Sequence, residues 1–153
     1  MELSGRPVDF SARQIANLDR LSGDVLIHCG DFCIGDNEEN TRKFMLAAHG
    51  FKKKILVRGN HDPQSDAWYL ARGWDFVCES FANTYFGKEV LFTHIPVKKF
   101  DRFDFNVHGH MHGNNHRVIE GMEYDPSFHI DLAPEIRNYA PVQLQDVLQS
   151  AHN

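Results

Sequence analysis

Aspartate, asparagine and histidine residues follow four short apolar stretches of the sequence, each of which reads as a strand. They are Asp31 after residues 24–29, Asn60 and His61 after residues 53–58, His94 after residues 89–92, and His110 and His112 after residues 105–107. Ligands of open α/β sheets bind at the carboxyl ends of strands, and glycines let the chain bend sharply there. We therefore expect these side chains to converge in one cleft.

The residue types at these positions suit a metal site. Imidazole nitrogens together with carboxylate and amide oxygens are typical ligands of Zn, Mn, Fe or Ni. Asp31 has two carboxylate oxygens, enough to bridge two cations. His110 and His112 would face opposite sides of an extended strand, whereas a turn can aim both rings inward. Two cations about 4 Å apart can hold a phosphate ester and activate the attacking water.

Each of these residues has an ordinary explanation when it is taken alone. Asp31 follows a glycine and His61 lies in a polar stretch, as turn residues do. His110 and His112 could be solvated or core histidines, and Asn60 alone indicates almost nothing. The prediction of a site depends on their order and on their shared position after strands.

The elements that must position these residues alternate in the first half of the chain. Helices are predicted at 9–21, 37–49 and 66–72, and strands at 24–29 and 53–58. The second half is mostly strand, at 74–80, 83–94 with a hairpin turn at 86–89, 102–109, 116–124 and 127–133, before a helix at 143–150. This layout predicts an α/β fold in which two mixed sheets pack as a sandwich flanked by helices. The length favours a single domain over residues 1–153.

The charge and composition exclude several classes of protein. Lysine and arginine number 16 and aspartate and glutamate 21, and the net charge of −5 argues against a broad nucleic-acid or membrane surface. A small phosphate substrate held by cations is compatible with it. No apolar run approaches the roughly 20 residues that cross a bilayer, and the first residues lack a signal peptide's pattern. Together with three sparse cysteines, read as reduced thiols, this predicts a cytoplasmic protein.

The ordered motifs GD (30–31), GNHD (59–62), TH (93–94) and GHMH (109–112) resemble those of the calcineurin-like metallophosphoesterase family, in its small bacterial and phage form. Other segments that resemble this form are SGRP (4–7), GDFCIGD (30–36), RGNHD (58–62) and NYAPVQL (138–144). The resemblance extends over about residues 4–142. It implies two packed mixed sheets with helices outside, and metal-dependent hydrolysis of a small phosphate mono- or diester.

The same resemblance implies a centre of two divalent cations. Asp31 would bridge both cations, while Asn60, His94 and His110 would complete one of the two sites. His112 would bind the other cation.

Two further residues of the GNHD motif would take part in catalysis. His61 would protonate the leaving oxygen or stabilise the charged phosphoryl group. Asp62 would orient His61, since a carboxylate partner sets the tautomer and basicity of an imidazole. Arg58 is a weaker candidate for a role near the site.

The sequence departs from the family in lacking the first motif, Asp-x-His at the end of an opening strand. Those two residues would be ligands of the cation that His112 binds, which leaves that cation only Asp31 and His112. Either the start codon has been assigned late, or the chain is a shortened form with one strong metal site. We favour the first explanation, because a missing strand would leave hydrogen-bonding groups of its neighbour unpaired.

Two other functions compete with phosphate-ester hydrolysis. The chain could be a catalytically weak or inactive member of this fold that keeps one metal site and acts as a binding or scaffold module. It could also be a zinc hydrolase acting on a non-phosphate bond, because His108, His110 and His112 alternate along the chain. The second alternative is disfavoured, because metallo-β-lactamase-like enzymes carry HxHxDH and no Asp-His follows His112.

Overall fold

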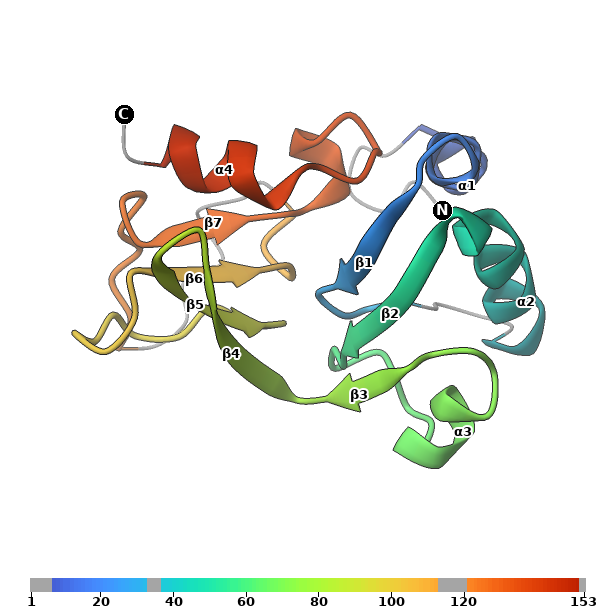
Figure 1. The fold of residues 1–153 in the computed structure, drawn as a ribbon, viewed down its shortest axis with the longest axis horizontal. Helices are drawn as coiled ribbons and strands as arrows, with labels where there is room; N and C mark the ends of the chain where they lie inside the picture. Colours follow the sequence, from blue (N-terminus) through green and yellow to red (C-terminus); the bar gives the residue numbers. More distant parts are fainter. Residues whose placement is uncertain (1–6, 33–36, 113–120, 152–153) are drawn as a thin grey trace.

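The computed structural model describes residues 7–32, 37–112 and 121–151, in which two sheets are flanked by helices (Figure 1). In chain order the elements are α1 (Phe10–Asp19), β1 (Gly23–His28), α2 (Asn37–Ala47), η1 (Ala48–Gly50), β2 (Phe51–Val57), α3 (Asp66–Leu70), β3 (Phe76–Cys78), β4 (Ser80–Tyr85), β5 (Lys88–Thr93), β6 (Phe105–His108), β7 (His129–Asp131), η2 (Pro134–Ile136) and α4 (Leu144–Ser150). This confirms the predicted α/β class with two sheets. The extent of the domain, residues 1–153, stays a prediction.

The first sheet has the order β1-β2-β3, and both pairs of strands are parallel. Helices α1 and α2 and the short η1 cover it with Leu18, Ala47 and Ala48, which pack against Leu26 of β1. Ile15 and Leu18 lie three residues apart on α1, the spacing that puts apolar side chains on one helix face. The helices and strands predicted in this half are therefore present, with slightly different ends.

The second sheet has the order β4-β5-β6-β7. Strands β4 and β5 form an antiparallel hairpin, and β5, β6 and β7 are parallel to one another. Phe86 and Gly87 at the predicted turn both have positive φ, 53° and 75°, as a two-residue hairpin loop of the I′ type requires. Apolar residues of β5 and β6 form the core, and Val147 and Leu148 of α4 pack against it.

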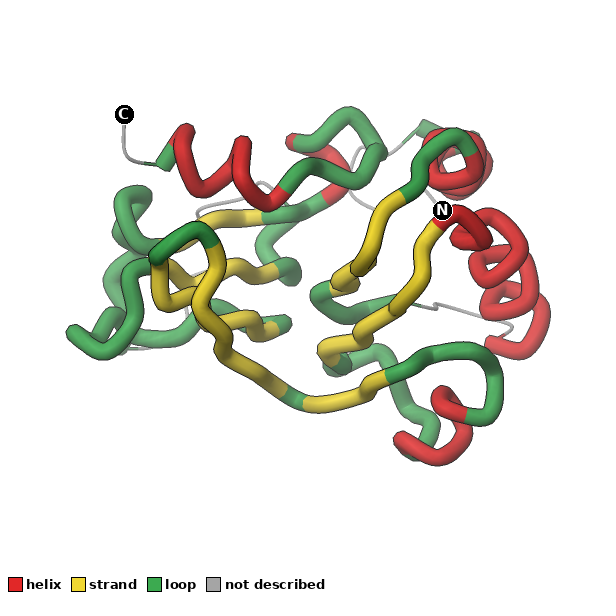
Figure 2. Tube along the Cα trace, in the orientation of Figure 1, coloured by secondary structure: helices red, strands yellow, loops and turns green. Residues whose placement is uncertain are grey.

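The carboxyl ends of β1 and β2 in the first sheet and of β5 and β6 in the second face the centre of the molecule, where loops from the two sheets lie side by side (Figures 1 and 2). The chain passes from the first sheet to the second through β3 and β4, with one residue between them. A second tie joins the chain's two halves, because the Asn17 side chain of α1 donates a hydrogen bond to the carbonyl of Tyr139, at 3.0 Å. This arrangement puts strand ends from both sheets beside each other.

Some sequence-based predictions fall partly outside the described residues. Residues 4–6, 33–36 and 116–120 belong to this group, and with them parts of the SGRP and GDFCIGD segments. The strand predicted at 116–124 is wrong for its described part, because residues 121–124 form a turn and irregular chain. Gly121 adopts φ +77°, a conformation that suits a turn better than a strand.

Two further features of the described residues concern membrane spans and cysteines. In the described part of the chain, no helix has the length and apolar character needed to cross a membrane. Cys29 and Cys78 form no disulfide, and burial raises the pKa of the Cys29 thiol to about 12. The cytoplasmic location itself stays a prediction.

Candidate metal centre

Three glycines let the loops after β1, β2 and β6 approach closely. Gly30 adopts φ +88°, and a Cβ atom there would lie 2.5 Å from Nδ1 of His94 and 2.6 Å from the backbone nitrogen of Gly59. A Cβ atom on Gly59 would collide with the backbone nitrogen and carboxylate of Asp31. A Cβ atom on Gly109 would lie 2.9 Å from the carbonyl oxygen of Cys29. Larger residues would push these loops apart.

The structure brings four of the predicted ligands together around Nε2 of His94. This nitrogen lies 3.0 Å from Oδ1 of Asn60, 3.1 Å from Nδ1 of His110 and 3.3 Å from Oδ2 of Asp31. Potential ligand atoms of Asp31, His94 and His110 all lie within 4.8 Å of one another. His94 is buried, with 4% of its surface exposed, and Asp31 is partly buried. The four side chains come from loops of both sheets.

A hydrogen bond on Nδ1, the nitrogen that does not face the cluster, fixes the orientation of the His94 ring. Its Nδ1–H donates to the carbonyl oxygen of Cys29 at 2.7 Å, so Nε2 faces the oxygen and nitrogen atoms of the other three side chains. A hydrogen bond of this kind on the far nitrogen is what holds metal-binding histidines in place. His28 supports the neighbouring loop, since its Nδ1 accepts the backbone N–H of Gly30 at 3.2 Å.

The pKa shifts at the centre favour a negative Asp31 beside a positively charged partner. Burial by itself would raise the pKa of Asp31, but the hydrogen bonds from His94 and from the His61 backbone outweigh it and lower the pKa to about 2. Burial would lower the pKa of His94, yet its contacts with Asp31 and the Cys29 carbonyl leave the pKa raised. A divalent cation could take the place of the proton on His94, and the mixed nitrogen and oxygen donors of this group would suit Mn, Fe, Zn or Ni.

We expect metal binding to strengthen as the pH rises. The raised pKa of His94 means that the metal-free ring holds a proton above its ordinary value of 6.5, and a cation must displace that proton. Asp31, with a pKa of about 2, is ionised throughout this range. Calorimetric titration with Mn²⁺ should give a larger association constant at about pH 8 than at about pH 6. An association constant that does not change with pH would contradict this assignment.

The ligand loops contain backbone conformations that non-glycine residues rarely adopt. Asp31, His110 and His112 have φ of 53°, 67° and 52°, in the left-handed region. Such conformations cost free energy and gather at functional sites, where the surrounding structure imposes them. They also end the extended chain after β6, so the alternation of an ideal strand no longer governs where His110 and His112 point.

His112 is not among the three residues whose ligand atoms all lie within 4.8 Å of one another. Its Nδ1 is 3.0 Å from Oε1 of Glu135 in η2, 23 residues further along the chain. The sequence-based reasoning missed Glu135, because no local motif marks this carboxylate and only the fold brings it to His112. Because Glu135 contacts Nδ1 of His112, the other ring nitrogen, Nε2, lies on the side of the ring away from Glu135.

The GNHD loop is braced by Asp62. The Asp62 carboxylate accepts the backbone N–H groups of Gly59 at 2.7 Å and Phe32 at 2.8 Å, so it ties the loop after β2 to the loop after β1. The backbone N–H of His61 donates to Oδ1 of Asp31 at 2.9 Å, and the residue is exposed. Asp62 makes no hydrogen bond to the His61 ring within the described residues. That orienting role stays a prediction.

Arg58, a weaker candidate for a role near the site, forms its contacts with residues that follow the GNHD loop. Its guanidinium donates to the carbonyl oxygen of Gln64 at 3.2 Å and forms an ion pair with Asp66. These contacts hold the chain between β2 and α3.

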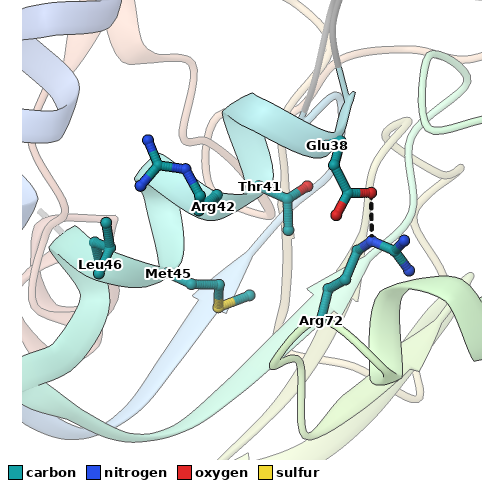
Figure 3. A pocket seen from close by; sticks show the side chains of 6 residues that line it. All are labelled: Glu38, Thr41, Arg42, Met45, Leu46 and Arg72. Atoms are coloured by element: carbon teal, nitrogen blue, oxygen red, sulfur yellow. Dashed lines mark hydrogen bonds and ion pairs between the residues drawn. The ribbon is translucent and has the colours of Figure 1, made fainter.

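A hollow of about 320 Å³ lies between α2 and the end of α3 (Figure 3). It is lined by Glu38, Thr41, Arg42, Met45, Leu46 and Arg72. None of the predicted ligands lines it, and the Arg72 Nε donates to Glu38 at 2.7 Å across it. This hollow is therefore distinct from the candidate metal centre.

Comparison with known proteins gives a family and a fold. The model of a family described as calcineurin-like phosphoesterase matches residues 10–128, more than half of the chain. The crystal structure of the protein of unknown function AQ665 from Aquifex aeolicus is similar, with a TM-score of 0.71 and 23% identity over 96% of this chain and 88% of that chain. At this identity the similarity shows the fold alone. No curated protein matches the chain.

Proposed function

We propose, from the premise that the chain belongs to the calcineurin-like phosphoesterase family, that it hydrolyses a phosphate mono- or diester with the help of divalent cations. The observation that supports this most is the meeting of Asp31, Asn60 and His110 around Nε2 of His94. When bound there, divalent cations polarise phosphoryl oxygens and lower the pKa of water. The substrate we propose is a small phosphate ester. Because the chain has a net charge of −5, cations would hold its negatively charged phosphate.

Two groups of residues would hold the cations. Asp31, Asn60, His94 and His110 would bind one, and their donor types fit it without any thiolate. Asp31 and His112 would contribute to a second. Glu135 would support the second cation indirectly, by holding Nδ1 of His112 so that Nε2 is the nitrogen presented.

His61 is the proposed acid. Its backbone N–H is tied to Asp31, which keeps this exposed residue beside the ligand cluster. From there the imidazolium can give its proton to the leaving oxygen, a role worth about 10²–10⁴-fold in rate. Stabilisation of the charged phosphoryl group is the other contribution that the ring can make.

The experiment is a hydrolysis screen of p-nitrophenyl phosphate and bis(p-nitrophenyl) phosphate with Mn, Ni, Zn, Fe or Mg. We expect turnover that depends on the added cation. Absence of turnover with every one of these cations would contradict the proposal.

Two histidine variants then test the role of His61 in the same assay. The variant His61→Asn should lower kcat for phenyl phosphate by about 10²–10⁴-fold, but less for p-nitrophenyl phosphate, whose leaving group needs little protonation. The variant His49→Asn changes an exposed histidine after α2 and should leave kcat unchanged. Equal losses on both substrates would instead assign His61 to phosphoryl stabilisation.

One observation favours the alternative of a scaffold with a single metal. Among the described residues, Asp31, His94 and His110 form the one group of three His, Cys, Asp or Glu residues close enough to share an ion. Metal analysis of purified protein separates the two functions. About two cations per chain with turnover supports the enzyme, and one cation without turnover supports the scaffold.

A further inference from the structure

We propose that His108 is a positioning residue that fixes the turn carrying His110, an inference that rests on the proposed metal-dependent function. His108 is the last residue of β6 and is fully buried, with 0% of its surface exposed. Its Nδ1–H donates to the carbonyl oxygen of Gly109 at 2.9 Å. That peptide leads directly into His110.

The Gly109 carbonyl is the anchor of an unusual turn. It also accepts the backbone N–H of Met111 at 2.8 Å, so the hydrogen bond spans only two residues. His110, between them, has φ of 67°. A hydrogen bond from residue i+2 to residue i around a positive φ makes a γ-turn of the rare, strained kind. A turn of this kind persists only where its neighbours hold it.

Hydrogen bonds hold Gly109 both at its backbone N–H and at its carbonyl. Its N–H donates to the carbonyl of His94 at 3.1 Å, and its carbonyl receives the donors from His108 and Met111. The result is that Nδ1 of His110 lies 3.1 Å from Nε2 of His94. Loss of the His108 donor would leave the Gly109 carbonyl with the Met111 N–H but without the side-chain donor that helps to hold the strained turn.

The other nitrogen of His108 argues against a simple packing role. Nε2 is buried and has no hydrogen-bond partner among the residues that the structure describes. The neighbouring ring of His129 cannot supply one, because its Nδ1 accepts from the Asp125 N–H and its Nε2 donates to the Val97 carbonyl. A buried polar atom without a partner destabilises a protein, so an apolar ring would suit this core position better. What only the imidazole provides is its Nδ1–H toward Gly109.

Two substitutions separate positioning from packing. His108→Asn keeps an N–H donor near the place of Nδ1 and removes Nε2, whereas His108→Phe keeps a ring and removes both nitrogens. Metal binding is measured with Co²⁺ alone, from its affinity and visible absorption spectrum, and the thermal midpoint is measured without metal. His129→Asn serves as the control for damage to the same core.

We expect His108→Phe to bind Co²⁺ about 10–100-fold more weakly and with an altered spectrum, as when a group supporting a ligand is lost. Its metal-free thermal midpoint should be unchanged or higher, because a buried orphan nitrogen is gone. His108→Asn should keep the wild-type affinity and spectrum. His129→Asn should lower the thermal midpoint and leave Co²⁺ affinity unchanged. If His108→Phe does not fold, His108→Gln replaces it, since its amide reaches the place of Nε2 instead.

Two results would overturn the positioning role while leaving the proposed function intact. One is wild-type Co²⁺ affinity in His108→Phe or His108→Gln, and the other is loss of affinity in His108→Asn as large as in those variants. Wild-type protein that binds no Co²⁺ would instead overturn the proposed function, and this inference with it.

Discussion

The variant Asp31→Asn is expected to lose metal binding and hydrolysis together. The carboxylate lies 3.3 Å from Nε2 of His94 and its pKa is lowered to about 2, so it provides a full negative charge at the centre. We expect Mn²⁺ affinity to fall by more than about 100-fold, beyond the effect of losing a supporting group. Turnover should fall by at least about 10³-fold, since cation binding contributes several kcal/mol of transition-state stabilisation. Calorimetry and the aryl phosphate assay measure the two effects.

A matched control removes the same charge elsewhere. Asp24 lies near the start of β1, where its exposed carboxylate pairs with Lys52 at 2.7 Å. Asp24→Asn should therefore leave affinity and turnover unchanged. The fold of Asp31→Asn should survive, because the new amide oxygen can still accept the His61 N–H that Oδ1 of Asp31 accepts. If Asp31→Asn bound the metal as tightly as the wild type, Asp31 would not be a ligand of the centre.

The variant Gly30→Ala is expected to cost about 2–5 kcal/mol of unfolding free energy. About 1–2 kcal/mol comes from placing a Cβ atom at φ +88°. A further 1–3 kcal/mol, roughly, comes from forcing apart the tightly packed loops, since that atom would lie 2.5 Å from Nδ1 of His94 and 2.6 Å from the Gly59 nitrogen. Urea denaturation of metal-free protein measures the loss. Metal affinity should fall as well, because the loops that carry Asp31 and His94 move apart.

Gly87→Ala separates these two contributions. Gly87 also has positive φ, +75°, but a Cβ atom there would meet no atom within 4 Å. Its loss of unfolding free energy should be about 1–2 kcal/mol, the backbone contribution alone. Equal losses for the two variants would show that the loops around Gly30 are loosely packed.

The fold could be predicted largely from local patterns. Asp31 and Asn60 follow apolar stretches that form strands β1 and β2, as predicted. The Phe86-Gly87 turn joins β4 to β5. These elements follow from burial of apolar residues and from turn conformations that neighbouring residues set by themselves. The strand expected at 116–124 is the exception in its described part, where Gly121 has positive φ and the chain turns.

The site could be predicted in its residue types and in part of its convergence, but not in its individual contacts. Asp31, Asn60, His94 and His110 were expected to converge, and they do so around one nitrogen. The contacts of Glu135 with His112 were not expected. Glu135 belongs to no motif, so the sequence does not mark it as a partner that the packing of distant loops brings to His112.

By itself, the sequence determined the chemical donors of this protein and their order after successive strands, because apolar runs and glycines specify strands and turns locally. Only the tertiary structure decided which donors share a point in space. That choice depends on the order of strands in two sheets and on left-handed conformations at Asp31 and His110. Contacts across the whole fold impose those conformations against the local preference of the residues.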